Sequence, residues 1–158
     1  MLLGEYTHTL DEKSRVIVPA KYREDLGDTF ILTKGIDGCL NVYSLEQWKS
    51  FELKLASLPL SDENSRKFVR YFTSGATLCE MDKQGRVVIP NNLKEFANLK
   101  KDVIFTGVST RAEIWDVDMW NKYMRQDADD LNNIASHMSN FGIWLYISYM
   151  AKNTKDNI

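Results

Sequence analysis

The sequence predicts a mixed α+β protein built from two repeated half-size units. Nearly the same nine residues occur at 11–19 and at 82–90. In each copy a turn is followed by three β-branched residues and a proline, whereas the stretch between the copies has the apolar spacing of helices. With 158 residues, 44% of them hydrophobic, the chain can bury one compact core or two small ones. We therefore expect two units that share a core.

A tight turn organises each copy of the nine-residue motif. An aspartate at the first turn position and a small residue at the fourth are typical of a type I β-turn, and both Asp11–Ser14 and Asp82–Gly85 have this pattern. The stretch before the first turn, Glu5–Leu10, alternates weakly and suits a strand. Each copy of the motif therefore predicts a β-hairpin.

Strands and short helices are predicted directly after each turn. Val16–Val18 and Val87–Ile89 are β-branched, favour extended backbone and run into a proline that must end the strand. Because proline is acceptable at the first position of a helix, short helices are expected at 20–26 and 91–97. Apolar strands then recur in both halves, at the positions 30–33, 103–106, 40–44 and 112–116.

The C-terminal segment of each unit is repeated as well. The segments 40–48 and 112–120 each end in a tryptophan, 72 residues apart (120 − 48 = 72). Ser44 and Asp116 stand where an N-cap oxygen would begin a helix. Helical spacing continues over three further segments, 47–58, 61–73 and 121–138, with Pro59 breaking the first two apart. The expected organisation is unit 1 at 5–47, a helical connector at 48–75, unit 2 at 76–119, and a C-terminal helix and tail at 120–158.

Composition excludes several classes of function. The formal net charge is −2 and the pI about 5.7, so any nucleic-acid site must be a local basic surface rather than a global field. The cysteines and histidines lie singly and outside metal-ligand or catalytic spacing, which predicts buried free thiols at Cys39 and Cys79, no metal site and no cofactor. The N-terminus lacks the features of a signal peptide and the apolar end of the chain is too short to span a bilayer, so a cytoplasmic location is expected.

The doubled motif carries the functional hypothesis. An aspartate and an arginine four residues apart across a turn can face one another, so the carboxylate would hold the guanidinium in one orientation. A positioned arginine can bind phosphate or guanine, and a two-stranded β-ribbon fits the major groove of DNA. For a single copy, a surface ion pair worth about 0–1 kcal/mol is the simpler explanation. Two copies, each with a lysine in the turn at Lys13 or Lys83, favour a binding function.

Two Asp-x-x-x-Arg motifs, each followed by a β-branched strand and a proline, in a chain that begins Met1-Leu2-Leu3-Gly4, resemble the MraZ family over residues 1–143. The resemblance implies two AbrB-like swapped-hairpin units that form one pseudo-two-fold β-barrel with flanking helices. It implies a transcriptional regulator of the division and cell-wall gene cluster, associated with the nucleoid. Its partners would be double-stranded DNA, bound at short direct repeats near a promoter, and further copies of the chain in a ring-like homo-oligomer.

The resemblance also assigns roles to particular residues. Arg15 and Arg86 would face the DNA, with Lys13 and Lys83 nearby, and Asp11 and Asp82 would position the arginines. A ring could display many copies of a small basic hairpin, so that avidity replaces net charge. The aromatic tail over 144–158 departs from the family pattern, and the two copies differ in that Ser14 stands where the second turn has a glycine. From this difference we expect Arg15 to be more exposed than Arg86.

Three alternatives remain open. An enzyme would need a glycine-rich phosphate loop, a nucleophile motif or a cluster of metal ligands, and the sequence has none of these patterns. An antitoxin-like binding module usually carries one hairpin unit and a toxin-binding tail, whereas this chain carries two units. In a purely structural oligomer the Asp-Arg pairs would stabilise subunit contacts without binding nucleic acid.

Overall fold

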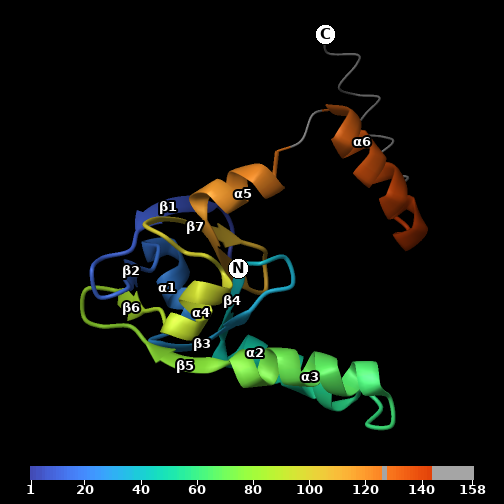
Figure 1. Cartoon of the computed structure of the whole chain (residues 1–158), viewed down its shortest axis with the longest axis horizontal. Helices are drawn as coiled ribbons and strands as arrows, with labels where there is room; N and C mark the ends of the chain where they lie inside the picture. The colour runs from blue at the N-terminus through green and yellow to red at the C-terminus, as the bar shows by residue number, and fades with distance from the viewer. Residues whose placement is uncertain (126–127, 144–158) are drawn as a thin grey trace. The chain divides into compact units, whose positions relative to one another are not determined.

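The computed structural model describes residues 1–125 and 128–143 and divides the chain into two compact units, Met1–Trp120 and Asn121–Ile158. The first unit contains both copies of the motif and every strand among the described residues (Figure 1). In the second unit the described elements are the helix α6 (Ala128–His137) and the short 3-10 helix η1 (Met138–Phe141), together with the end of α5.

A six-stranded antiparallel sheet forms the centre of the first unit. Its strands, in spatial order, are β1 (Glu5–Thr9), β7 (Asp102–Gly107), β8 (Ala112–Asp116), β4 (Leu40–Ser44), β3 (Thr29–Lys34) and β5 (Thr77–Glu80). This order is symmetric: counted inward from the two edges, β1 corresponds to β5, β7 to β3 and β8 to β4, with one strand of each pair in each repeat. The two repeats are thus related by a pseudo-two-fold axis between β4 and β8. The sheet is open, with β1 and β5 at its edges, so the closed barrel implied by the resemblance is not observed.

A second, two-stranded sheet is built from the motifs themselves. β2 (Arg15–Ile17) and β6 (Arg86–Val88) pair antiparallel, one strand from each repeat. Val16 lies opposite Val87 at the centre of this pairing, and both side chains are buried in the main core. We call β2, β6 and their two preceding turns the motif ribbon.

The prediction of a β-hairpin within each motif is therefore wrong for the strands, although it is right for the turns. β1 pairs with β7 and β2 pairs with β6, both across the repeats. The local backbone bonds of the first motif lie at its turn, where the Asp11 N–H donates to the Arg15 C=O at 2.9 Å and the Ser14 N–H to the Asp11 C=O at 3.0 Å. Pairing across the repeats places both central valines of the motif ribbon in the same core.

Helices follow both prolines as predicted. α1 (Ala20–Leu26) begins directly after Pro19, and α4 (Asn91–Phe96) directly after Pro90. The prolines occupy the N-cap rather than the first helical position, with φ of −49° and −58° and an extended ψ. The apolar side of each helix packs into the main core.

The helical connector forms the hairpin of α2 (Leu45–Ala56) and α3 (Glu63–Gly75). The Ser44 hydroxyl caps α2 by accepting from the Gln47 N–H at 3.2 Å, as the sequence predicts. A second apolar cluster forms under the hairpin from five buried side chains: Ile31, Tyr43, Trp48, Leu55 and Phe72. Phe68 lies at the edge of this cluster, 41% exposed, with its ring against that of Phe72.

The end of the chain differs from the single helix predicted over 121–138. α5 (Val117–Tyr123), capped by the Asp116 carboxylate, ends early, and α6 begins only at Ala128. The acidic pair Asp129 and Asp130 lies in the first turn of α6, where the helix dipole favours negative charge, so these residues begin a helix rather than continue one. The aromatic tail over 144–158 lies outside the described residues. Among the described residues no helix is both long and apolar enough to cross a membrane.

The two thiols are buried, as predicted. Burial raises the pKa of Cys39 to about 12 and that of Cys79 to about 11. Neither is therefore suited to act as a nucleophile, because the thiolate is the reactive form. In the described part of the chain there is also no cluster of three or more side chains that could hold a metal ion.

Candidate nucleic-acid interface

Each Asp-x-x-x-Arg motif forms a four-residue turn closed by one backbone hydrogen bond. The Ser14 N–H donates to the Asp11 C=O, and the Gly85 N–H to the Asp82 C=O, both at 3.0 Å. The fourth residue adopts a left-handed backbone in both turns, with φ of 56° at Ser14 and 76° at Gly85. Glycine takes this conformation freely, whereas serine does so at some steric cost, so the two turns have the same shape but different local energies.

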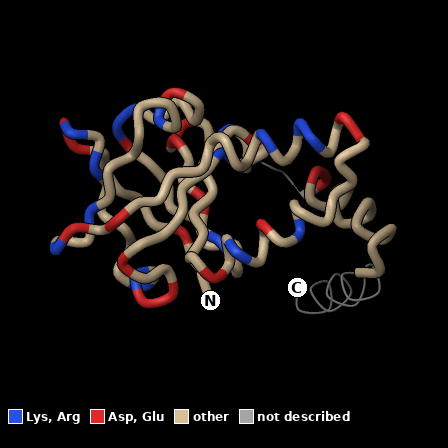
Figure 2. Tube along the Cα trace, turned by 90° about the horizontal axis from the view of Figure 1, so that it is seen from below, with Lys and Arg blue, Asp and Glu red and all other residues tan. Residues whose placement is uncertain are grey.

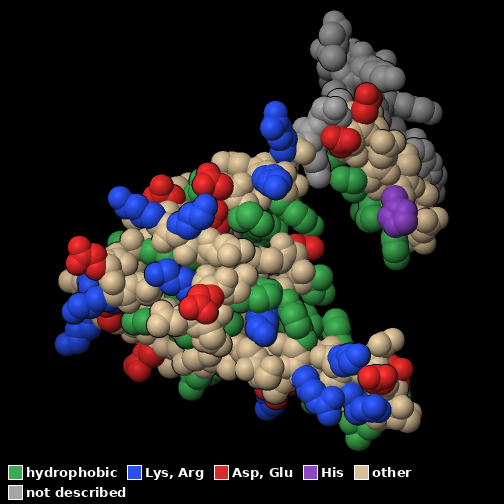
Figure 3. Space-filling model, viewed as in Figure 1, with side chains coloured by type: hydrophobic (Ala, Val, Ile, Leu, Met, Phe, Trp, Pro, Cys, Tyr) green, Lys and Arg blue, Asp and Glu red, His purple; other side chains and the backbone are tan. Residues whose placement is uncertain are grey.

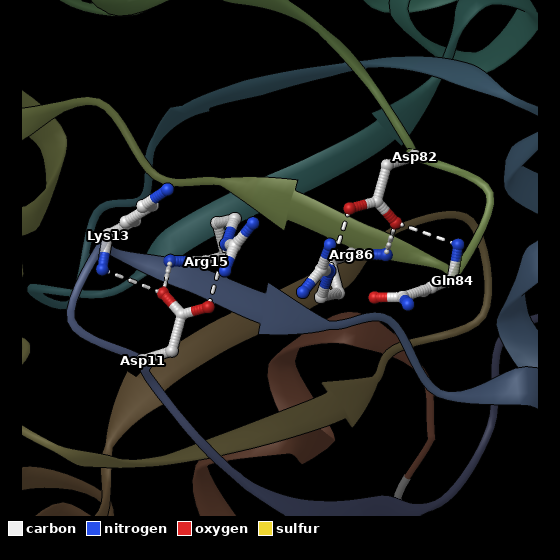
Figure 4. Close-up of polar contacts among 6 residues, drawn as sticks. All are labelled: Asp11, Lys13, Arg15, Asp82, Gln84 and Arg86. Carbon is white, nitrogen blue, oxygen red and sulfur yellow. Dashed lines mark hydrogen bonds and ion pairs between the residues drawn. The ribbon is translucent and has the colours of Figure 1, made fainter.

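The aspartate of each motif binds its turn and its arginine together. One carboxylate oxygen of Asp11 accepts from the backbone N–H groups of Lys13 and Arg15, both at 2.9 Å, and the other accepts from Arg15 Nε at 2.7 Å. Asp82 makes the same three bonds in the second turn, at the same distances (Figure 4). The guanidinium direction is therefore set by the turn, as the spacing predicts.

These bonds hold both aspartates in the charged form. The pKa of Asp11 is lowered first by the backbone N–H of Arg15 and then by its side chain, and that of Asp82 is lowered in the same way by Arg86. Because the folded-state pKa lies below the unfolded value, this contribution to stability is present above the unfolded pKa. It is lost as the pH falls through the folded pKa.

Removing the Arg15 side chain should raise the pKa of Asp11 only in part, because the backbone N–H of residue 15 is the largest cause of the lowering. In Arg15→Ala the pKa of Asp11 should rise but remain below the ordinary 3.8, because the backbone N–H of residue 15 still donates. The pKa of Asp82 should not change, since its partner is Arg86. A carboxyl-carbon NMR titration of Asp11 and Asp82 in the wild type and in Arg15→Ala measures this. A return of Asp11 to its ordinary pKa would contradict the assigned cause.

The two arginines lie on adjacent strands of the motif ribbon, and Figure 4 shows the pairs Asp11–Arg15 and Asp82–Arg86 related by a half-turn. Their side chains are 27% and 28% exposed, so the prediction that Arg15 would be the more exposed is wrong. Within the described part of the chain each arginine uses only its Nε in hydrogen bonds. The terminal nitrogens of both guanidinium groups are thus available to a ligand.

The two turn lysines are exposed but not equivalent. Lys13 is the third residue of its turn, a position that Gln84 takes in the second, whereas Lys83 is the second residue and corresponds to Glu12. Each turn of the motif ribbon therefore carries one lysine, at a different position, and the first turn also carries the acidic Glu12.

Charge of both signs is distributed over the molecule. Lysines and arginines are interspersed with acidic residues along the trace (Figure 2), and on the face seen in Figure 3 several of them gather around the end of the α2–α3 hairpin. The motif ribbon follows the same mixed pattern, because each of its arginines lies beside the aspartate of its own motif. A nucleic-acid site on the ribbon would therefore depend on individual arginines and not on a broad basic surface.

Two further basic residues reach the turns, and sequence reasoning missed both. Arg23 of α1 lies against Gly85, and Lys94 of α4 donates to the Ser14 hydroxyl at 3.2 Å. Each helix thus contacts the turn of the other repeat. A signal was present, since Arg23 and Lys94 are 71 residues apart (94 − 23 = 71), the same offset as the motif arginines (86 − 15 = 71).

Comparison with known proteins shows the same division into two repeats. A family model described as "MraZ protein, putative antitoxin-like" matches residues 1–71 and again residues 72–141. The chain belongs to the MraZ family. The resemblance drawn from the doubled motif is thereby confirmed.

Named relatives within the MraZ family are similar along their whole length. Proteins from Caldanaerobacter subterraneus subsp. tengcongensis and Clostridium acetobutylicum are each 54% identical over 143 residues, and one from Moorella thermoacetica is 50% identical over the same length. Each alignment covers 90% of this chain and 100% of the relative. All three are named "Transcriptional regulator MraZ", which places the family among regulators and not among enzymes.

Proposed function

We propose that this protein is a sequence-specific DNA-binding transcriptional regulator that contacts DNA through the motif ribbon. One observation carries the proposal: two arginines, one from each repeat, are held by aspartates on a two-stranded antiparallel ribbon with their terminal nitrogens free among the described residues. A ribbon of this kind fits the major groove, and an arginine can bind guanine there through two hydrogen bonds. The name of the relatives supports the same function.

The residues of the motif ribbon divide into two roles. Arg15 and Arg86 contact the DNA, and the exposed Lys13 and Lys83 add attraction to phosphates. Asp11 and Asp82 do not contact the DNA but orient the arginines, so that less side-chain freedom is lost on binding. This division is supported by the three bonds that each carboxylate makes within its own motif.

We further infer that the protein binds as a ring-like homo-oligomer to short direct repeats near the promoter of its division and cell-wall gene cluster. In this proposal the units at 5–47 and 76–119 act together in each subunit. A chain with a net charge of −2 gains little from long-range attraction to DNA, so several weak local contacts must act at once. When subunit spacing matches repeat spacing, later contacts become intramolecular and strengthen binding without new surface.

Binding should depend steeply on salt despite the acidic pI. We expect the full-length protein to bind DNA from upstream of its own gene more tightly than a scrambled fragment. A fourfold rise in salt should weaken binding by about 10³-fold or more if six or more phosphates are contacted. Fluorescence anisotropy at two salt concentrations measures both, and the mass in solution with and without DNA reports the oligomer. Equal affinity for the two fragments would contradict sequence-specific binding.

An antitoxin-like module is the second candidate, because the description of the family itself contains that term. In this case the chain would form a stable complex with a toxin encoded beside its gene. Co-expression with the products of the neighbouring genes, followed by size-exclusion chromatography, separates the two candidates. A stoichiometric complex that forms without any DNA preference would favour the antitoxin.

A further inference from the structure

The guanidinium of Arg23 occupies the space beside Gly85. A Cβ added at Gly85 would lie 2.3 Å from Arg23 Cζ and 2.5 Å from one of its terminal nitrogens, so no side chain fits unless the guanidinium moves. The backbone of Gly85 is buried under this contact. Glycine is thus favoured at position 85 for two reasons, its left-handed backbone and the guanidinium that covers it.

The position of Arg23 is fixed by the strand that follows the other turn. Its Nε donates to the Val18 C=O at 3.0 Å, while the Val18 N–H donates to the Gly85 C=O at 2.8 Å. Val18, Arg23 and Gly85 therefore form a closed set of contacts that joins the first repeat to the second turn. Moving the guanidinium away would break the bond to Val18.

In the first turn, Ser14 and Lys94 take the places that Gly85 and Arg23 have in the second. The Ile89 N–H donates to the Ser14 C=O at 2.8 Å, which repeats the bond between Val18 and Gly85. Here the residue from the helix is Lys94, whose ammonium meets the serine hydroxyl at 3.2 Å instead of covering bare backbone. A slender lysine leaves room for a side chain at position 14, whereas the broad arginine fork does not.

We propose that Arg23 and Lys94 are positioning residues for DNA binding, and that Gly85–Arg23 and Ser14–Lys94 are two matched pairs that each hold the turn of the opposite repeat. Each pair acts on the residue that directly precedes a DNA-contacting arginine, Arg86 or Arg15. The proposal rests on the proposed function, because what is positioned is the DNA-binding ribbon.

Replacing the Gly85–Arg23 pair with the serine and lysine of the first turn tests whether the two pairs are matched. Gly85→Ser should weaken DNA binding about tenfold, because the serine displaces the guanidinium that holds the turn before Arg86, whereas the left-handed backbone itself is one that Ser14 already adopts. Arg23→Lys alone should weaken it about threefold, since the bond to Val18 is lost. The double variant Gly85→Ser with Arg23→Lys recreates the pair of the first turn. It should bind within about threefold of the wild type, although independent effects would multiply to about 30-fold. A double variant that is about 30-fold weaker overturns the proposal.

Two further measurements separate positioning from other roles. If Arg23 contacted phosphate itself, Arg23→Gln would lower the slope of log K against log salt by about one, whereas a positioning residue leaves the slope unchanged. The unfolding midpoints of the four exchange proteins show whether each is folded. If the wild type binds DNA without sequence preference, the proposed function fails and the positioning role with it. If the wild type binds specifically but the exchange shows no rescue, only the matched pairs are wrong.

Discussion

Replacing Arg15 and Arg86 together with alanine should weaken binding to promoter DNA about 100-fold or more, because each well-placed arginine contributes about 1–3 kcal/mol. The fold should survive, since in the described part of the chain the side chain of each arginine bonds only to the aspartate of its own motif. The single variants should lose similar amounts, because the two sites have the same bond lengths and nearly equal exposure. Fluorescence anisotropy at one salt concentration measures all three.

A matched control is available on the helical connector. Arg70 lies exposed on α3, outside the motif ribbon, so Arg70→Ala removes the same charge and should change the affinity by less than about threefold. Circular dichroism of each variant checks the fold. A double variant that binds as well as Arg70→Ala would show that the ribbon arginines do not contact DNA, and would favour the purely structural explanation of the Asp-Arg pairs.

Phe105→Ala should lower the free energy of unfolding by about 3–5 kcal/mol, since the ring is fully buried and its loss leaves a cavity in a packed core. Phe105 lies in β7, which pairs with strands of both the edge and the centre of the sheet. Its ring meets those of His8 and Tyr22 edge to face, so these contacts are lost as well. Urea unfolding followed by tryptophan fluorescence measures the change.

Leu78→Ala provides the comparison for this loss. Leu78 is also a large apolar residue in a strand, but it is 63% exposed, so the change should stay within about 0.5 kcal/mol. Similar losses for the two variants would contradict the placement of Phe105 in the core and of Leu78 on the surface.

Local structure was largely predictable from sequence because it depends on residues near one another in the chain. The Asp-x-x-x-Arg turns, the strand ends at Pro19 and Pro90, and the serine cap of α2 are all local effects. Strand pairing is not local. The β-branched run at 16–18 shows that its residues are extended and in part buried, but nothing in its periodicity shows that β6, rather than β1, is the neighbour.

The same distinction between local and long-range contacts explains which parts of the functional site were predictable. The bonds of Asp11 to Arg15 were predictable from their spacing, whereas the contact of Arg23 with Gly85 spans 62 residues (85 − 23 = 62) and depends on the crossing of the repeats. The expected difference in exposure between the two motif arginines was wrong for a related reason. Ser14 adopts the same left-handed turn as glycine, so the local change did not alter the direction of Arg15.

The most direct test of the account is protection of individual arginines from phenylglyoxal by promoter DNA, measured by mass spectrometry of the modified full-length protein. Phenylglyoxal reacts with free guanidinium groups, so a guanidinium that binds DNA should become protected. The account predicts that promoter DNA protects both Arg15 and Arg86 while Arg70 stays as reactive as before, and that scrambled DNA protects them much less. Unchanged modification of both ribbon arginines under conditions where the protein is bound to DNA would contradict it.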